Sequence, residues 1–438
     1  MDNIGLAMIV DFTVTNFTSL KEEQLFSMYA DKDYDLHGDN LFFHKDDFAV
    51  LRTSGILGAN ASGKSNLFKA FRTLEKIVTT SYRYEEGDEI PGYKPYALCE
   101  FLSQSPIKME LEFIVKDKRY IYSIVFDQYN IQEESLYFYP SAKPAKIFHR
   151  HSPDNWKDEE GLSLGGYLKG GKRRHAFFAN NAYLSVAGSS AESPEDIREI
   201  FQYFKRDWGY LNSQSTPHIM KWEQDDKAVR AMKSIMCGVD LGVSGFKFKD
   251  KKLNKNISDS LADIPEEFRE KLVESFSKEI SFAHTNEQGG ETFFELDDES
   301  LGTKRLSNVM PMLLLTLKSG GVLFCDEIEQ SFHAHVVELI IKIFNDPTVN
   351  LNNAQLIFTT HNIQVMKAKT MRKDQLWLTE KRNGATSYTS LQDFDSSLRD
   401  NSPFDKWYAE GRLGGIPSLD YYDISKGVRR AVRPEDYA

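Results

Sequence analysis

The stretch GANASGKSN at residues 58–66 decides the fold class. It fits the pattern G-x-x-x-x-G-K-[ST], in which glycines let the backbone curl so that several N–H groups point inward at phosphate oxygens. From average residue frequencies, this pattern arises by chance in about one chain in a hundred of this length. The residues that we expect to bind a nucleotide are Gly58, Asn60, Ala61, Ser62, Gly63, Lys64, Ser65 and Asn66.

The residues on either side of this loop predict a strand before it and a helix after it. Residues 48–58 form an apolar run typical of a buried strand, and residues 65–78 carry apolar side chains at helical spacing. The loop therefore lies at a helix N-terminus, where the positive end of the helix dipole favours an anion. We expect Lys64 to contact the β- and γ-phosphates of ATP as a catalytic residue, and Ser65 to bind Mg²⁺.

Two later segments supply what a phosphate-binding loop lacks for hydrolysis. In GGVLFCDE, Asp326 ends an apolar strand and is expected to hold Mg²⁺ through water, while Glu327 would polarise the attacking water. In LIFTTH, His361 ends another buried strand and is expected to donate to the γ-phosphate. Strand C-termini converge on the ligand in a doubly wound sheet. Without the loop, the Asp-Glu pair would be interpreted as a helix cap and the histidine as a strand end.

A second anion-binding helix start is predicted between these segments. Residues 297–309, DDESLGTKRLSNV, place Ser300, Gly302 and Thr303 where another helix begins. One ATP does not need two such helix starts in the same chain. Two copies arranged head to tail would use both, each closing the nucleotide of the other. We therefore expect a homodimer or a higher homo-oligomer.

Composition limits the class of protein. The 438 residues are 41% hydrophobic and 27% charged, as in a soluble globular protein of two or three lobes. The net charge of −11 argues against a general nucleic-acid coat but allows a local basic patch. No apolar run approaches the roughly 18–20 residues of a membrane span. We expect a cytoplasmic protein without a membrane partner, with a non-secretory N-terminus and three buried free thiols.

The chain is expected to fold in three parts. Residues 1–140 combine the loop with alternating strands of an antiparallel sheet, and residues 141–295 form a mostly helical insertion or lid. Residues 296–438 alternate strands with helices, which is typical of a parallel sheet covered on both faces. The predicted fold class is therefore α/β, a P-loop ATPase head with an N-terminal antiparallel β subdomain and a helical insertion.

The order of these motifs resembles the ABC-type ATPases of the SMC-like branch. More narrowly, it resembles the bacterial AAA-15/AAA-21 group, found among abortive-infection and other phage-defence ATPases. The resemblance covers roughly residues 8–78 and 295–420 and implies an ABC-type head. The resemblance also implies roles for individual residues. Ser300, Gly302 and Thr303 would correspond to the signature, which acts on a partner's γ-phosphate. Glu327 would correspond to the catalytic glutamate and His361 to the switch histidine.

The match to that group is incomplete at two points. The usual signature is Leu-Ser-Gly-Gly-Gln, of which only Ser300 and Gly302 are kept. The resemblance also implies a Mg²⁺-contacting glutamine soon after the first helix, for which Gln104 is the candidate.

Three functions remain open from the sequence. The resemblance favours a sensor or regulator ATPase that holds a separate effector, such as a TOPRIM-type nuclease, and releases it on infection. The alternative is a DNA-repair or chromosome-maintenance ATPase that clamps DNA. It predicts a basic groove built from Lys169, Lys172, Arg173 and Arg174. A transporter motor is least favoured, because membrane-coupling features are not found.

A metal site at His333 and His335 is a separate possibility. We interpret these histidines instead as residues beside the dimer contact, because helix residues two apart point in different directions.

Overall fold

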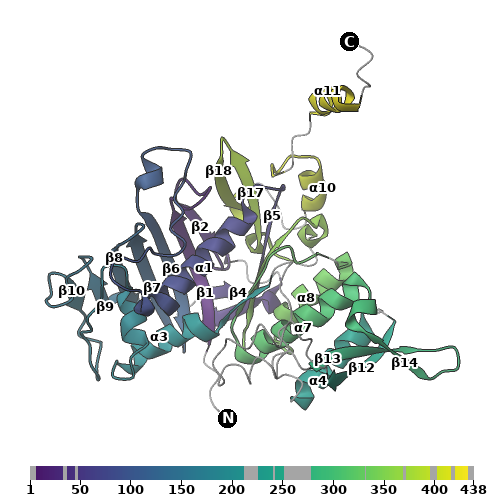
Figure 1. The fold of residues 1–438 in the computed structure, drawn as a ribbon, viewed down its shortest axis with the longest axis horizontal. Coiled ribbons are helices and arrows are strands. Elements are labelled where there is room, and N and C mark those ends of the chain that lie inside the picture. The colour runs from purple at the N-terminus through teal and green to yellow at the C-terminus, as the bar shows by residue number, and fades with distance from the viewer. Residues whose placement is uncertain are drawn as a thin grey trace, which may run out of the picture.

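The computed structural model describes residues 6–32, 37–44, 48–211, 225–239, 242–250, 278–330, 332–367, 371–394, 402–415 and 420–432. Two large sheets dominate this part of the chain (Figure 1). None of the helices in these ranges is long and apolar enough to cross a membrane.

A six-stranded sheet carries the strand ends that form the candidate site. Its order is β11-β15-β16-β5-β17-β18, and only the edge strand β18 runs antiparallel to its neighbour. Its strands are β5 (Thr53–Gly58), β11 (Trp208–Leu211), β15 (Val322–Cys325), β16 (Gln355–Thr360), β17 (Leu376–Arg382) and β18 (Ala385–Ser390). Cys325 pairs with Phe358, and Thr360 pairs with Leu57. The C-terminal ends of β15, β16 and β5 therefore meet at one edge.

A seven-stranded antiparallel sheet forms the N-terminal lobe, in the order β10-β9-β8-β7-β6-β1-β2. Its strands are β1 (Ala7–Thr15), β2 (Gln24–Ser27), β6 (Ile107–Val115), β7 (Lys118–Phe126), β8 (Ile131–Phe138), β9 (Ala145–Arg150) and β10 (Leu162–Leu164). Alternate residues such as Met109, Leu111 and Phe113 are buried on one face. The expected antiparallel subdomain is confirmed.

Helix α1 (Lys64–Thr80) joins the two sheets. The ring of Phe71 stacks on Phe12 of β1 with centroids 4.1 Å apart, and lies 4.7 Å from the ring of Phe324 on β15. The helix therefore packs between the antiparallel sheet and one face of the parallel sheet (Figure 1).

The opposite face of the parallel sheet is covered by α7 (Leu301–Ser319) and α8 (Ala334–Asn345). The apolar residues that these helices bury there are Leu306, Val309, Met310, Leu313, Val337, Ile340, Ile341 and Phe344. Adjacent residues on one strand, such as Ile56 and Leu57, belong to different cores because strand side chains alternate. The predicted sheet with helices on both faces is confirmed.

The stretch 141–295 mixes helices and strands in its described part. Besides β9, β10 and β11, it contains α2 (Tyr183–Gly188), α3 (Glu195–Arg206), α4 (Asp226–Gly238) and the three-stranded sheet of β12 (Val243–Asp250), β13 (Lys278–Thr285) and β14 (Glu291–Glu295). This mixture differs from the expected mostly helical insertion, because its strands pair with partners that local periodicity does not reveal. The three-part division of the chain stays a prediction.

The remaining described elements are short. They are the hairpin of β3 (Leu41–His44) and β4 (Phe48–Leu51), and the helices α9 (Leu391–Phe394), α10 (Phe404–Ala409) and α11 (Tyr421–Val432). All three cysteines are free thiols. Cys325 is buried, Cys99 is partly buried and Cys237 is exposed, so the prediction of burial is wrong for Cys237.

Candidate nucleotide-binding site

The glycines of the loop at 58–63 are required by the space around them. Gly58 ends β5, and a Cβ atom there would lie 1.9 Å from Thr379 Oγ1. Gly63 has a φ of 108°, and a Cβ atom there would lie 2.3 Å from Thr386 Oγ1. Between them, Ala61 is exposed with a left-handed φ of 60°. The backbone thus curls tightly from the strand end into the start of α1.

Three hydroxyl groups from β17 and β18 hold this loop. Ser62 Oγ and Thr379 Oγ1 lie 2.7 Å apart, and Thr386 Oγ1 donates to the Ser62 carbonyl over 2.7 Å. Tyr388 OH donates to the Gly63 carbonyl over 2.7 Å. These bracing residues were not predicted from the sequence. They follow Ser62 by more than 300 positions, and no motif marks them.

Lys64 folds back over the loop that precedes it. Its ammonium donates to the carbonyls of Gly58 over 2.8 Å and Ala59 over 3.0 Å, and the side chain is buried. Burial lowers the pKa of Lys64, and the nearby carboxylates of Glu327, Glu329 and Asp326 oppose that change. The ammonium therefore already lies beside the loop amides that would face a phosphate.

Ser65 and Asp326, the two residues expected to bind Mg²⁺, lie side by side. Ser65 Oγ donates to Asp326 Oδ1 over 3.1 Å, and Thr359 Oγ1 donates to the same carboxylate oxygen over 2.6 Å. Hydroxyl and carboxylate oxygens are the ligands that Mg²⁺ prefers, with phosphate oxygens and water completing its shell. The donor set therefore fits Mg²⁺ bound together with a nucleotide.

Glu327 and His361 are exposed at the same edge of the sheet. Glu327 has a left-handed φ of 53°, and its N–H donates to Thr359 Oγ1 over 2.8 Å. A non-glycine residue in this conformation costs about 1–3 kcal/mol, so the neighbouring contacts must hold it there. The N–H of His361 donates to Glu329 Oε1 over 2.6 Å.

The second predicted helix start lies on the other face of the central sheet. Ser300 is the N-cap of α7, and its Oγ accepts a hydrogen bond from the Thr303 N–H over 3.1 Å. Ser300 and the adjacent Leu301 are exposed. Because α7 packs on the face opposite α1, the structure groups Ser300, Gly302 and Thr303 together but away from α1.

Other sequence candidates fall outside this cluster. Gln104 is exposed on a short 3₁₀ turn whose backbone is held by the side chain of Asn16. The rings of His333 and His335 lie 4.8 Å apart at the start of α8. Within the described ranges, no group of three or more His, Cys, Asp or Glu residues could hold a metal ion.

The basic segment at 169–174 is largely engaged with its own lobe. Lys172 pairs with Glu192 at 3.5 Å, and Arg174 pairs with Glu159. Arg173 donates to the Leu168 carbonyl over 3.3 Å. A basic groove for DNA would need these cations to face outward together, so their pairing does not favour the DNA-clamping alternative.

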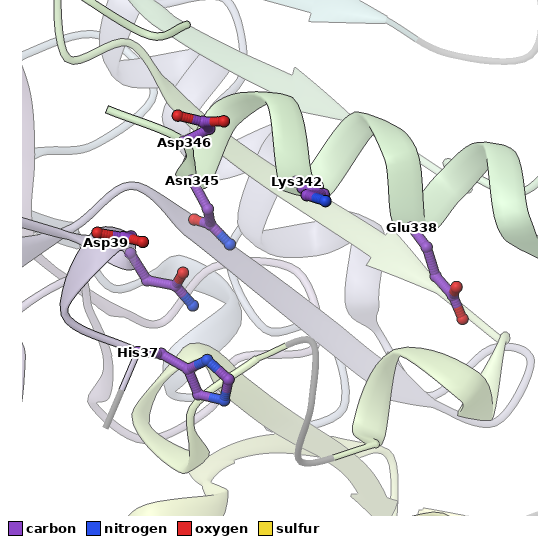
Figure 2. A pocket seen from close by; sticks show the side chains of 7 residues that line it. His37, Asp39, Glu338, Lys342, Asn345 and Asp346 are labelled. Atoms are coloured by element: carbon purple, nitrogen blue, oxygen red, sulfur yellow. The ribbon is translucent and has the colours of Figure 1, made fainter. Parts of the chain in front are cut away.

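A cavity of about 400 Å³ lies at the other edge of the sheet (Figure 2). Its lining residues are His37, Asp39, Asn40, Glu338, Lys342, Asn345 and Asp346. Asn345 ends α8 and accepts a hydrogen bond from Thr53, the first residue of β5. The nucleotide loop follows the last residue of that strand, so this cavity is separate from the candidate site.

Comparisons with known proteins agree with the loop chemistry. The model of the AAA_21 family, described as "AAA domain, putative AbiEii toxin, Type IV TA system", matches residues 54–367. No curated protein sequence gives a significant match.

Solved structures give weak likenesses. An SMC head domain from Thermotoga maritima is 13% identical with a TM-score of 0.38, over 87% of this chain and 98% of that chain. An Smc head domain from Pyrococcus furiosus, with an extended coiled coil and bound to the C-terminal domain of ScpA, is 11% identical. Its TM-score is 0.36, over 88% of this chain and 97% of that chain.

Proposed function

We propose that this chain, which belongs to the AAA_21 family of AAA domains, is a Mg²⁺-dependent ATPase. The observation that carries the proposal is the 3.1 Å contact between Ser65 Oγ and Asp326 Oδ1. More than half of the chain separates these two oxygens, yet they lie together at the start of the helix that follows the phosphate-binding loop. A site that binds only a phosphate needs no such pair of metal ligands.

Different residues of the site would bind the phosphates and the metal ion. The loop N–H groups and the start of α1 would receive the phosphates, and Lys64 would turn from the Gly58 and Ala59 carbonyls to the β- and γ-phosphate oxygens. Ser65 and Asp326 would hold Mg²⁺, which neutralises charge that develops on the phosphates during transfer.

Glu327 and His361 would act on the γ-phosphate side. Glu327 directly follows Asp326 in the chain, and its carboxylate would orient and deprotonate the attacking water. His361, at the end of the adjacent strand β16, would donate to the γ-phosphate. Both side chains are exposed, so a second molecule can cover them.

Closure of the site is proposed to come from a second copy of the chain. Helix α7 has 19 residues, or about 28 Å at 1.5 Å per residue, and β15 has 4 residues, or about 13 Å. Only Gly320 and Gly321 join them. The start of α7 therefore projects past the strand ends, which supports Ser300 and Gly302 reaching the γ-phosphate of a partner head to tail. Thr303 is only 1% exposed and its hydroxyl lies 2.9 Å from that of Ser300, so it would act through Ser300.

Glu327→Gln tests the hydrolytic role. We expect ATP turnover to fall by about 10²–10³-fold, because the amide cannot accept a proton from water. ATP should still bind, so the variant should form an ATP-dependent dimer or larger assembly, measured by light scattering after size exclusion.

Lys64→Ala is the matched control. We expect it to lose ATP affinity by about 10- to 100-fold in calorimetry, since one charged hydrogen-bonding partner is removed. It should not assemble with ATP. Turnover at the normal rate by Glu327→Gln would contradict the role of Glu327, and unchanged ATP binding by Lys64→Ala would contradict the site itself.

We further propose that the ATPase is a sensor or regulator in anti-phage defence that controls a separate effector, such as a nuclease. The description of the matched family, which names an AbiEii toxin and a type IV TA system, agrees with the resemblance of the sequence to abortive-infection ATPases. An ATP-dependent assembly is a suitable switch for this purpose, because hydrolysis removes the phosphate that joins the two copies.

Copurification from the host identifies the partner. We expect tagged Glu327→Gln, trapped with ATP, to retain one protein in constant ratio, and Lys64→Ala to give a different ratio, as measured by mass spectrometry. Nucleic acid in place of a protein would support the DNA-clamping alternative. Identical preparations of both variants without a partner would contradict effector control.

A further inference from the structure

The turn after β15 is attached to the end of β16 residue by residue. Thr359 Oγ1 donates to Asp326, the Glu327 N–H donates to Thr359 Oγ1 over 2.8 Å, and the Ile328 N–H donates to the Thr359 carbonyl over 3.1 Å. The fourth residue of this run, Glu329, accepts from the N–H of His361, two positions after Thr359, over 2.6 Å. Each contact connects the segment that carries the acids to the strand that carries the histidine.

Asp326 and Glu329 make these contacts through their side chains, whereas Glu327 and Ile328 use backbone N–H groups. Glu329 stands out because its two carboxylate oxygens have different surroundings. Oε1 accepts the His361 N–H, whereas Oε2 is buried and has no hydrogen-bond partner among the described residues. Holding a carboxylate with one unsatisfied buried oxygen costs free energy, so it requires a compensating role. An apolar side chain would avoid that cost if filling space were its only task.

We infer that Glu329 is a positioning residue for ATP hydrolysis, which holds His361 in register with Glu327 through the His361 N–H. This inference rests on the proposed ATPase function. His361 begins the segment after β16, where its backbone leaves the sheet, and the Glu329 carboxylate holds that point by a side-chain hydrogen bond. Without it, the imidazole would lose the backbone position from which it reaches the γ-phosphate.

The main test compares Glu329→Ala with Glu329→Gln. We expect Glu329→Ala to lower kcat for ATP by about 10- to 100-fold with a change in KM below about threefold, because misplacing a reacting group slows chemistry more than binding. Glu329→Gln should recover to within about threefold of the unaltered chain, since its amide oxygen also accepts the His361 N–H. Gln330→Ala, an exposed neighbour in the same turn, is the matched control and should leave kcat unchanged.

Hydrogen exchange at the His361 amide gives a readout that needs no nucleotide. We expect exchange to be about tenfold or more faster in Glu329→Ala than in the unaltered chain, and to stay slow in Glu329→Gln. A residue that only stabilises the fold would lower the unfolding temperature without selectively exposing this amide.

The double variant Glu329→Ala with His361→Ala separates positioning from a direct role. If Glu329 acts only through His361, the double variant should hydrolyse ATP no more slowly than His361→Ala alone. Additive losses, or a normal kcat in Glu329→Ala, would overturn the inference while leaving the ATPase assignment intact. If the unaltered chain neither binds nor hydrolyses ATP, the proposed function fails instead.

Discussion

Gly58 and Gly63 are both needed in the phosphate-binding loop, for different physical reasons. At Gly58 the obstacle is Thr379, whose hydroxyl would lie 1.9 Å from an added Cβ atom. At Gly63 the backbone itself is also unfavourable for other residues, with φ at 108°. The same threonines donate hydrogen bonds that hold the loop in place. The two glycines leave the room that these threonines of β17 and β18 need in order to reach the loop.

Gly63→Ala should therefore impair nucleotide binding. The added methyl group would lie 2.3 Å from Thr386 Oγ1, forcing the loop or β18 to move and disturbing the bond from Thr386 to the Ser62 carbonyl. We expect ATP affinity to fall at least about tenfold, or about 1.4 kcal/mol, in calorimetry.

Gly427→Ala is the control for that substitution, because apart from its own chain neighbours and helix backbone nothing lies within 4 Å of the Cβ position at Gly427. It should leave affinity unchanged. An affinity within twofold in Gly63→Ala would show that the loop accommodates a side chain at this position.

Among the elements, apolar strands and amphipathic helices were predictable, and the pairing of strands that are distant in the sequence was not. Strands β5, β15 and β16 were expected because runs such as LIFTTH are apolar and bounded by turns. β11 has only four residues, and nothing local indicates that it pairs in parallel with β15. In the described part of 141–295, β9 pairs with β8 and β11 pairs with β15, which the helical expectation did not include.

The hydrogen bonds that hold the phosphate-binding loop in place also depend on how the strands pair. Strands β17 and β18 position Thr379, Thr386 and Tyr388 against the phosphate-binding loop. The sequence predicted alternating strands and helices over 296–438 but gave no reason to connect any of these strands to the loop. Parallel pairing of β17 with β5, with Thr379 opposite Gly58, creates that connection.

An aromatic cluster around α1 joins the two large sheets to each other. Phe71 of α1 contacts Phe12 of the antiparallel sheet, and Phe324 and Trp208 of the parallel sheet. The phosphate-binding loop lies at the start of this helix, so movement of the loop and packing of both sheets are mechanically linked.

Phe71→Ala should destabilise the whole fold. Phe71 is fully buried, and removing its ring leaves a cavity between the two sheets. We expect a loss of about 3–5 kcal/mol in the free energy of unfolding, measured by urea denaturation. Phe101→Ala, at a position that is 79% exposed, should change stability little. Equal unfolding midpoints for the two variants would contradict the joining role of Phe71.

The residues of the candidate site could be proposed from the sequence alone, because each motif that marks them is local. Glycine spacing, a Lys-Ser pair at a helix start, and acids or a histidine at the ends of apolar strands are patterns of neighbouring positions. Only the folded chain decided which strands lie side by side, which hydroxyl groups brace the loop, and that Glu329 contacts His361. Those contacts join positions that are 32 to 325 residues apart, and they depend on register and packing that no local pattern encodes.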